Sequence, residues 1–290
     1  MASRQIPTIV PEFDLNTETR QVIRLGRNSA AVRRRDELAA EEPLEIRVDS
    51  HPVSVTMRTP GHDEELAAGF LLSEGLVRRR EEILQIKAHP RNRQDNVLDV
   101  FLSPEVKVDF ARLTRNVFVS SSCGLCGKAT IEAVHQYFPP LRARVGVAPE
   151  TLLALPERMR ERQVSFARTG GLHAAALFDT EGNLLELRED VGRHNAVDKV
   201  IGWGLLQERL PLARHVLLVS GRASFEILQK ALAARIPMVC AVSAPSSLAV
   251  AFARAGGQTL VGFLRGESFN VYSHPEQIFE PPHRGPQRGQ

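Results

Sequence analysis

Two of the three cysteines in this 290-residue chain, Cys123 and Cys126, lie three positions apart in the Ser- and Gly-rich stretch SSSCGLCGK. Ile131 and Val134 follow at helical spacing, which predicts that the pair lies at or one turn before a helix N-terminus. The helix dipole and the unpaired backbone N–H groups at such a position favour a thiolate, and Lys128 adds a nearby cation. At least one of the two sulfur atoms is therefore expected to be nucleophilic near neutral pH.

A zinc site is one use of such a pair. Zinc takes four ligands, or three and a water molecule, so His173 or His194 would have to complete the set. The third cysteine, Cys240, lies in the apolar run PMVCAVSA, where a small buried side chain is the plainer expectation. The sequence has no second C-x-x-C and no H-x-x-x-H. Zinc deaminases carry a glutamate two positions after the histidine ligand, but Ala175 stands there, so we expect no metal site.

Two thiol chemistries stay open, and the alternative to both is a turn whose two cysteines have no chemical role. In the first, the two cysteines form a thioredoxin-like redox pair. In the second, one thiolate accepts a sulfane sulfur as a persulfide and passes it on, which requires a nucleophilic cysteine on an accessible loop. The small residues of SSSCGLCG supply the conformational freedom for such a loop. The chemistry of the residues does not rank these two.

Two predicted strand-to-helix turns, VSGRASFE and VSAPSSLA, could hold an anion. Each places small residues and hydroxyl groups before a helix, where backbone N–H groups suit phosphate. If their strands are neighbours, both turns meet at one edge of the sheet, where α/β folds bind ligands. The alternative is simple helix capping by serine. The candidate residues are Ser220, Gly221, Arg222 and Ser243, with Ser246 as a further capping residue.

Three further segments carry polar or stacking side chains. LREDVGRHNAVDKV, which includes Arg193 and His194, is either a helix cap with solvated charges or a polar wall for a ligand. His173, in GGLHAAAL, is by default a core histidine, although the glycines before it allow a ligand to approach. TLVGFLRGESFNVYS is either an ordinary hairpin or one in which Phe263 and Arg265 cover a flat ring.

The order of the predicted elements indicates an α/β protein with an α+β N-terminal part. PLEIRVDSHPVSVTMRT predicts a hairpin, DEELAAGFLLSEGLV a helix and NVLDVFLS a strand. Beyond the cysteines, apolar strands alternate with helices, as in a layered sandwich. We expect a loose tail over 1–20, a small α+β subdomain over 21–115, the cysteine loop and its helix over 116–149, an α/β domain over 150–275 and a disordered tail over 276–290.

The composition is that of a globular protein with a net charge of +3 and a pI near 9.0. Aromatic residues make up 6%, too few for a nucleic-acid stacking platform, and we read AVRRRDEL and LVRRREEI as exposed helix or loop faces. The N-terminus does not have the pattern of a signal peptide, and the most apolar stretch is broken by prolines, serines and an arginine. We therefore expect a soluble cytoplasmic protein that binds neither nucleic acid nor membrane.

Six ordered segments together resemble the formate dehydrogenase accessory sulfurtransferase (FdhD-type) family. They are SSSCGLCGKATIEA, TGGLHAAALFD, REDVGRHNAVDKVIG, VSGRASFEILQKA, AVSAPSSLAV and LVGFLRGESFNVYS. The resemblance spans about residues 40–275. It implies a C-terminal three-layer domain of cytidine-deaminase-like type without deaminase zinc chemistry, beside a smaller β-rich N-terminal subdomain.

The resemblance also implies a function. Family members take sulfur from a cysteine desulfurase and deliver it to the bis(molybdopterin guanine dinucleotide) cofactor of molybdenum or tungsten, which then enters formate dehydrogenase. By this resemblance Cys123 carries the persulfide and Cys126 assists it. The family's cofactor-binding stretch falls on Phe263, Leu264, Arg265, Gly266, Glu267 and Ser268. The resemblance further implies a homodimer that binds the cofactor as a substrate and keeps none permanently.

Two other classes of function stay open. One is a thiol–disulfide oxidoreductase without sulfur cargo, against which the anion-binding turns argue, because such an enzyme needs no phosphate ligand. The other is a chaperone that binds and protects the cofactor without transferring sulfur.

Overall fold

The computed structural model describes most of the chain. The described residues are 16–27, 29–88, 96–108, 110, 131, 134–135, 137–142 and 144–279. Cys123, Cys126 and the strand predicted before them lie outside these residues.

The N-terminal unit is a four-stranded sheet covered on one face by a helix. The strand order is β4-β3-β6-β5, with β3 and β6 parallel and the outer strands antiparallel to their neighbours. The predicted hairpin, helix and strand are confirmed, and the hairpin turns at Asp49 and Ser50, which both have positive φ. The elements are β3 (Glu42–Val48), β4 (His51–Arg58), α1 (Asp63–Ser73), the short 3-10 helix η1 (Arg80–Glu82), β5 (Ile83–Ala88) and β6 (Val97–Leu102).

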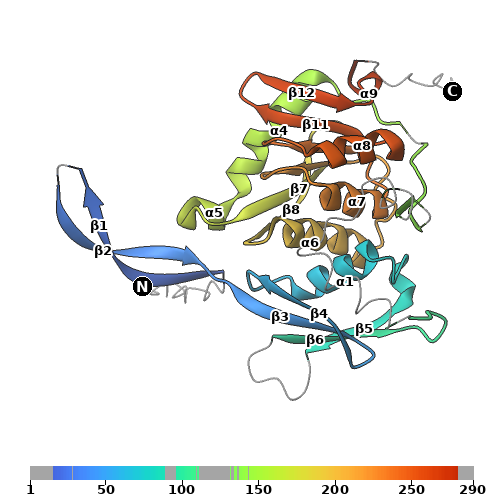
Figure 1. Ribbon diagram of the computed structural model, residues 1–290, viewed down its shortest axis with the longest axis horizontal. Coiled ribbons are helices and arrows are strands. Elements are labelled where there is room, and N and C mark those ends of the chain that lie inside the picture. Colours follow the sequence, from blue (N-terminus) through green and yellow to red (C-terminus); the bar gives the residue numbers. More distant parts are fainter. Residues whose placement is uncertain are drawn as a thin grey trace, which may run out of the picture.

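A long antiparallel ribbon precedes this unit and extends away from the body of the molecule (Figure 1). It consists of β1 (Thr17–Gly26) and β2 (Ser29–Ala39), and we call it the arm. The chain is therefore a strand from Thr17 onward, where the sequence predicts a loose tail to residue 20. The segment AVRRRDEL is also a strand rather than a helix or loop, although most of its side chains are exposed as predicted.

The C-terminal unit is a six-stranded sheet in the order β12-β11-β10-β9-β7-β8, with helices on both faces. Strands β9, β10 and β11 are parallel, and β7, β8 and β12 run antiparallel to their neighbours. The predicted strands and helices of this half are confirmed. The elements are α4 (Pro149–Arg162), α5 (Val164–Thr169), β7 (His173–Phe178), β8 (Leu184–Asp190), α6 (Arg193–Leu206), β9 (Val216–Val219), α7 (Phe225–Ala233), β10 (Met238–Ala241), α8 (Ser247–Gly256), β11 (Thr259–Arg265), β12 (Ser268–Ser273) and α9 (Glu276–Phe279).

Alternation along the strands divides the core of this unit in two. On β7, Ala175 and Leu177 face the helices α6, α7 and α8, whereas Ala176 and Phe178 face α4 and α9. The unit therefore has three layers, and its α/β class is confirmed. A likeness to cytidine deaminases stays a prediction. Residues 276–279 form α9, where the sequence predicts a disordered tail.

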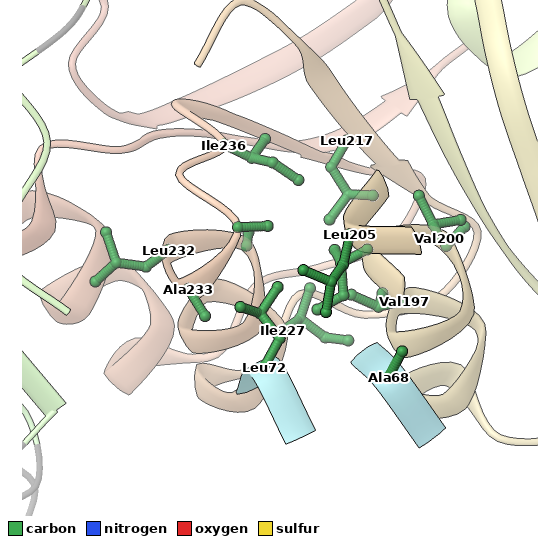
Figure 2. Close-up of a cluster of buried hydrophobic side chains, with 14 of the residues drawn as sticks. Ala68, Leu72, Val197, Val200, Leu205, Leu217, Ile227, Leu232, Ala233 and Ile236 are labelled. Carbon is green, nitrogen blue, oxygen red and sulfur yellow. The ribbon is translucent and has the colours of Figure 1, made fainter. Parts of the chain in front are cut away.

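Helices α1 and α6 join the two units. Figure 2 shows Ala68 and Leu72 of α1 in one buried cluster with Val197 and Leu205 of α6. The two backbones approach closely, because a Cβ built at Gly69 would lie 1.9 Å from the carbonyl oxygen of Asp198, and one at Gly202 would lie 1.8 Å from that of Glu65. Only glycine fits at these two positions of the crossing.

No helix among the described residues is long and apolar enough to cross a membrane.

Candidate functional site

Two loops meet at the edge of the sheet where the parallel strands β9 and β10 end. They are residues 220–224 before α7 and 242–246 before α8. The N–H of Ala223 donates to the carbonyl oxygen of Ala244 at 3.2 Å, and the N–H of Ser246 donates back to that of Ala223 at 3.0 Å. The predicted meeting of the two turns is confirmed, so the N-termini of α7 and α8 lie at the same edge of the sheet. We call residues 220–224 and 242–246 together the loop edge.

The serines in these loops have different tasks. The hydroxyl of Ser246 caps α8 by accepting the N–H of Ala249 at 3.2 Å. Ser220 instead accepts the N–H of Ala174 at 2.9 Å, which ties the loop to β7. Ser224 is the N-cap residue of α7, but its side chain accepts no capping hydrogen bond from the helix. Helix capping by Ser220, Ser243 and Ser246, the alternative to anion binding, is therefore seen for Ser246 alone of these three: Ser220 binds β7, and Ser243 is not the N-cap residue of α8.

His173 and Arg193 come together around Gly221. A Cβ built at Gly221 would lie 3.3 Å from Nδ1 of His173 and 3.8 Å from Cδ of Arg193. His173 is half-buried rather than a core residue. Burial and the charge of Arg193 hold the pKa of His173 below its usual value, so its ring is neutral near pH 7. Gly221 leaves the space that lets these two side chains face the loop.

His194 stands next to this group at the start of α6. Its Nε2 lies 3.3 Å from the hydroxyl oxygen of Ser224 and 4.0 Å from a carboxylate oxygen of Glu226. Burial, and then the charges of Arg193 and Lys230, lower the pKa of His194 to about 4. The cations at this edge are therefore arginines, and the two histidines contribute neutral rings.

Most of the other polar residues of LREDVGRHNAVDKV are committed to contacts inside the protein. Asp190 pairs with the buried Lys199 at 2.7 Å, and Asp198 pairs with Lys230 at 2.7 Å. Arg188 pairs with Glu65 of α1, and Glu189 accepts N–H groups from the start of α5. Of this segment, Arg193 and His194 are the side chains that reach the loop edge.

The turn between β11 and β12 forms the third side of this edge. The N–H of Phe263 donates to the carbonyl oxygen of Ser243 at 3.1 Å, and Phe263 has a φ of 54°. The guanidinium carbon of Arg265 lies 5.6 Å from the centroid of the Phe263 ring. Residues 265–268 are exposed, whereas the side chain of Leu264 is fully buried in the core, which leaves only its backbone for a ligand.

The positions of the candidates divide them into three groups. The loop edge brings together His173, Arg193, His194, Ser220 and Gly221, with Ser243 touching the third loop through its carbonyl group. The side chain of Arg222 is exposed beside them. Phe263, Arg265, Gly266, Glu267 and Ser268 form the hairpin turn described above. Cys123 and Cys126 lie outside the described residues.

A cavity of about 550 Å³ opens beside His173 and Ser220, under the corner between α4 and α5. Arg160 and Phe166 line it, and the guanidinium carbon of Arg160 lies 4.4 Å from the centroid of the Phe166 ring. The sequence analysis misses both residues. In the sequence they are only an arginine and an aromatic residue six positions apart. This spacing does not predict a contact, which forms because α4 and α5 turn toward each other.

The described residues hold no cluster of His, Cys, Asp or Glu that could bind a metal ion. Cys240 is fully buried in β10, and burial raises the pKa of its thiol. It is therefore the small buried side chain that the sequence predicts and not a ligand.

The loop edge with its arginines suits a large anionic ligand, and comparisons with known proteins agree with the resemblance seen in the sequence. The profile of the FdhD/NarQ family matches residues 39–279. Sulfur carrier protein FdhD of Mycobacterium tuberculosis is 55% identical over 257 residues, covering 85% of this chain and 93% of that protein. The protein of the same name from Streptomyces coelicolor is 53% identical over 274 residues, covering 90% and 95%.

More distant relatives extend the match. Sulfur carrier protein FdhD of Sulfurisphaera tokodaii is 44% identical over 255 residues, covering 87% of this chain and 95% of that protein. A crystal structure of a protein from Desulfotalea psychrophila, assigned as a formate dehydrogenase accessory protein, superposes with a TM-score of 0.72 at 26% identity. The superposition covers 91% of this chain and 99% of the Desulfotalea psychrophila chain. The chain belongs to the FdhD/NarQ family.

Proposed function

We propose that this protein is a sulfur carrier in the maturation of formate dehydrogenase. It accepts sulfane sulfur from a cysteine desulfurase as a persulfide on Cys123 and transfers it to the bis(molybdopterin guanine dinucleotide) cofactor of molybdenum or tungsten. The observation that carries the proposal is membership of a family whose relatives at 53–55% identity are named sulfur carriers.

The loading step is a thiol–persulfide exchange. The Cys123 thiolate attacks the terminal sulfur of the desulfurase persulfide, the S–S bond of the donor breaks, and the donor cysteine leaves as a thiolate. The charge and the number of electrons are unchanged, so no other reactant is needed. A thiolate at a helix N-terminus has the nucleophilicity that this step requires.

Release of the sulfur as sulfide needs two electrons, and Cys126 can supply them. Its thiolate attacks the inner sulfur of the Cys123 persulfide, a Cys123–Cys126 disulfide forms, the bond between the inner and outer sulfur breaks, and the outer sulfur leaves with its proton as HS⁻ to be taken up by the cofactor. A cellular dithiol then reduces the disulfide and restores both thiols. In this scheme Cys123 is required for loading and Cys126 for release.

The loop edge supports binding of a guanine dinucleotide. The ligand carries phosphates and flat rings, and the site offers two helix N-termini together with Arg193, Arg222 and Arg265. Phe263 beside Arg265 supplies a stacking surface. The neutral rings of His173 and His194 can accept or donate hydrogen bonds without adding a positive charge that would repel Arg193. We propose that the protein binds this cofactor as a substrate, as a homodimer in the cytoplasm, before the cofactor enters formate dehydrogenase.

Intact-mass spectrometry tests the carrier role directly. The protein, Cys123→Ala and Cys126→Ala are each incubated with a cysteine desulfurase and cysteine. We expect a reducible gain of about 32 Da per sulfur atom in the protein and in Cys126→Ala, and none in Cys123→Ala. No gain in the protein itself, with an active desulfurase, would contradict the proposal and favour a redox pair or a chaperone.

A second experiment separates the carrier from a chaperone. Both bind the cofactor, but only the carrier needs Cys123 to activate the client enzyme. We expect Cys123→Ala to retain binding of guanosine diphosphate, used as a probe for the cofactor's nucleotide end, and to lose activation of formate dehydrogenase. Activation that survives in Cys123→Ala would favour the chaperone.

A further inference from the structure

The arm is strongly cationic toward its tip. Residues 20–35 contain six arginines and no aspartate or glutamate. The same part of the arm exposes large apolar side chains, with Ile23 61%, Leu25 74% and Val32 56% accessible. Large apolar side chains exposed among arginines are unusual on a free surface and are typical of an interface.

Both faces of the ribbon carry arginines, and one of them combines two arginines with two of the three exposed apolar side chains. Ile23 lies directly across from Arg33, and Gln21 lies across from Arg35, so these four side chains share a face. Leu25, two residues beyond Ile23, continues the same face. We call Ile23, Leu25, Arg33 and Arg35 the docking face.

The cations of the docking face have no carboxylate partner within the described chain. Arg20 and Arg34 pair with Glu18 and Asp36 on the opposite face, but neither Arg33 nor Arg35 forms a salt bridge with any described residue. An isolated two-stranded ribbon is also only marginally stable in water. A partner that covers this face would satisfy the charges and bury the apolar side chains.

The base of the arm is attached to the wall of the cavity. Arg168 of α5 pairs with Glu37 at 2.5 Å and donates to the hydroxyl of Thr17 at 3.1 Å. α5 also supplies Phe166 to the lining of the cavity beside His173. The arm therefore leaves the body beside the candidate site, and the docking face lies farther out along the ribbon (Figure 1).

We propose that the docking face binds the sulfur-donor protein through an acidic surface with an apolar centre. The inference rests on the proposed function, in which sulfur loading requires direct contact with another protein, because the donor's persulfide stays covalently attached to it. The cofactor, by contrast, is a small anion that the loop edge can hold without the arm. Charge complementarity sets the chemistry of the partner: carboxylates opposite Arg33 and Arg35 around a patch that covers Ile23 and Leu25.

Binding of a cysteine desulfurase from the same organism to the full-length protein tests this inference. The charge variant is Arg33→Glu/Arg35→Glu, and its matched control is Arg78→Glu/Arg79→Glu, which makes the same change of charge at two exposed arginines far along the chain. A second control, Arg33→Lys/Arg35→Lys, keeps the charge. We expect the charge variant to weaken binding at least about tenfold, and both controls to stay within about twofold of the unchanged protein.

The apolar half of the docking face is tested separately. Ile23→Ser/Leu25→Ser removes it, and Val55→Ser/Leu84→Ser is the control, since those side chains are 63% and 61% accessible. We expect the first pair to weaken binding about tenfold and the second to leave it unchanged. Raising the ionic strength from about 50 to 300 mM should weaken binding of the unchanged protein and have less effect on the charge variant.

Two readouts keep the outcomes distinct. The first readout is loading of Cys123 from a low-molecular-weight persulfide, measured as a gain of intact mass. This reaction does not use the arm, so it should be equal in all variants. If it fails in the unchanged protein, the proposed function is wrong. If the desulfurase loads Cys123 but binds the arm variants as tightly as the unchanged protein, the arm inference is wrong. Sedimentation velocity gives the remaining outcome, because arm variants that dissociate the protein's own oligomer would assign the face to a second copy and overturn the donor assignment.

Discussion

His194 shows how the surroundings of one side chain set its charge. Burial and the neighbouring Arg193 bring its pKa to about 4, so the ring is neutral at pH 7. Because the folded pKa lies below the unfolded value near 6.5, the protein prefers the neutral ring. The stability that depends on this neutral ring is present above pH 6.5 and is lost as the pH falls toward 4.

We expect Arg193→Gln to raise the pKa of His194 toward its ordinary value, because it removes the cation that lowers this pKa most. Histidine-selective NMR titration from pH 8 to 4 measures the change. Arg222→Gln, a change at an exposed arginine in the loop before α7, is the control. An unchanged titration of His194 in Arg193→Gln would show that Arg193 does not contribute to the low pKa.

The buried pair of Asp198 and Lys230 should be sensitive to the loss of one partner. Lys230→Met leaves the Asp198 carboxylate inside the core with Ser73 as its remaining partner, which we expect to cost about 3 kcal/mol of unfolding free energy. The double variant Asp198→Asn/Lys230→Met should cost less than the sum of the single changes. Urea unfolding of the three variants gives the coupling, and additive losses would contradict a paired charge.

Single residues also show what the sequence can and cannot predict. Cys240 was predictable as buried because its strand is apolar throughout. The convergence of His173, Arg193 and Gly221 was not, since it depends on β7 lying antiparallel beside β9. The sequence identified Arg188 and Asp190 as polar but could not show that their partners, Glu65 and Lys199, would take them out of the site.

At the scale of elements, the crossing of α1 and α6 leaves no room for a side chain. We expect Gly69→Ala and Gly202→Ala each to cost about 3 kcal/mol or more, because the added Cβ would meet a backbone carbonyl oxygen that cannot move aside. Urea unfolding measures the loss. Gly256→Ala at the end of α8 is the control, where the nearest atom would lie 3.5 Å away, and it should be neutral or slightly stabilising.

The elements that the sequence missed lack a regular apolar pattern. The arm reads as a run of arginines because both of its faces are exposed, so no alternation marks it as a strand. Helix α4 contains Pro156, which argues against a helix in the sequence. Helix α6 is buried nearly all round, because α1 covers the side turned away from the sheet.

At the scale of the whole molecule, the helix crossing should make the two units unfold together. The single tryptophan, Trp203, lies in α6 beside Arg209, so its fluorescence reports on the crossing, and far-UV circular dichroism reports on both sheets. We expect the two signals to give one coincident urea transition. Two separate transitions, with fluorescence following only one of them, would show that the units are thermodynamically independent.

The burial of Cys240 has a practical consequence for counting thiols. An alkylating reagent cannot reach this side chain while β10 is intact, so any mass tag added to the native protein reports on Cys123 and Cys126. A third tag appears only when the chain opens. One labelling reaction, run with and without denaturant, therefore measures how many reactive thiols are free and what fraction of the sample was folded when they were counted.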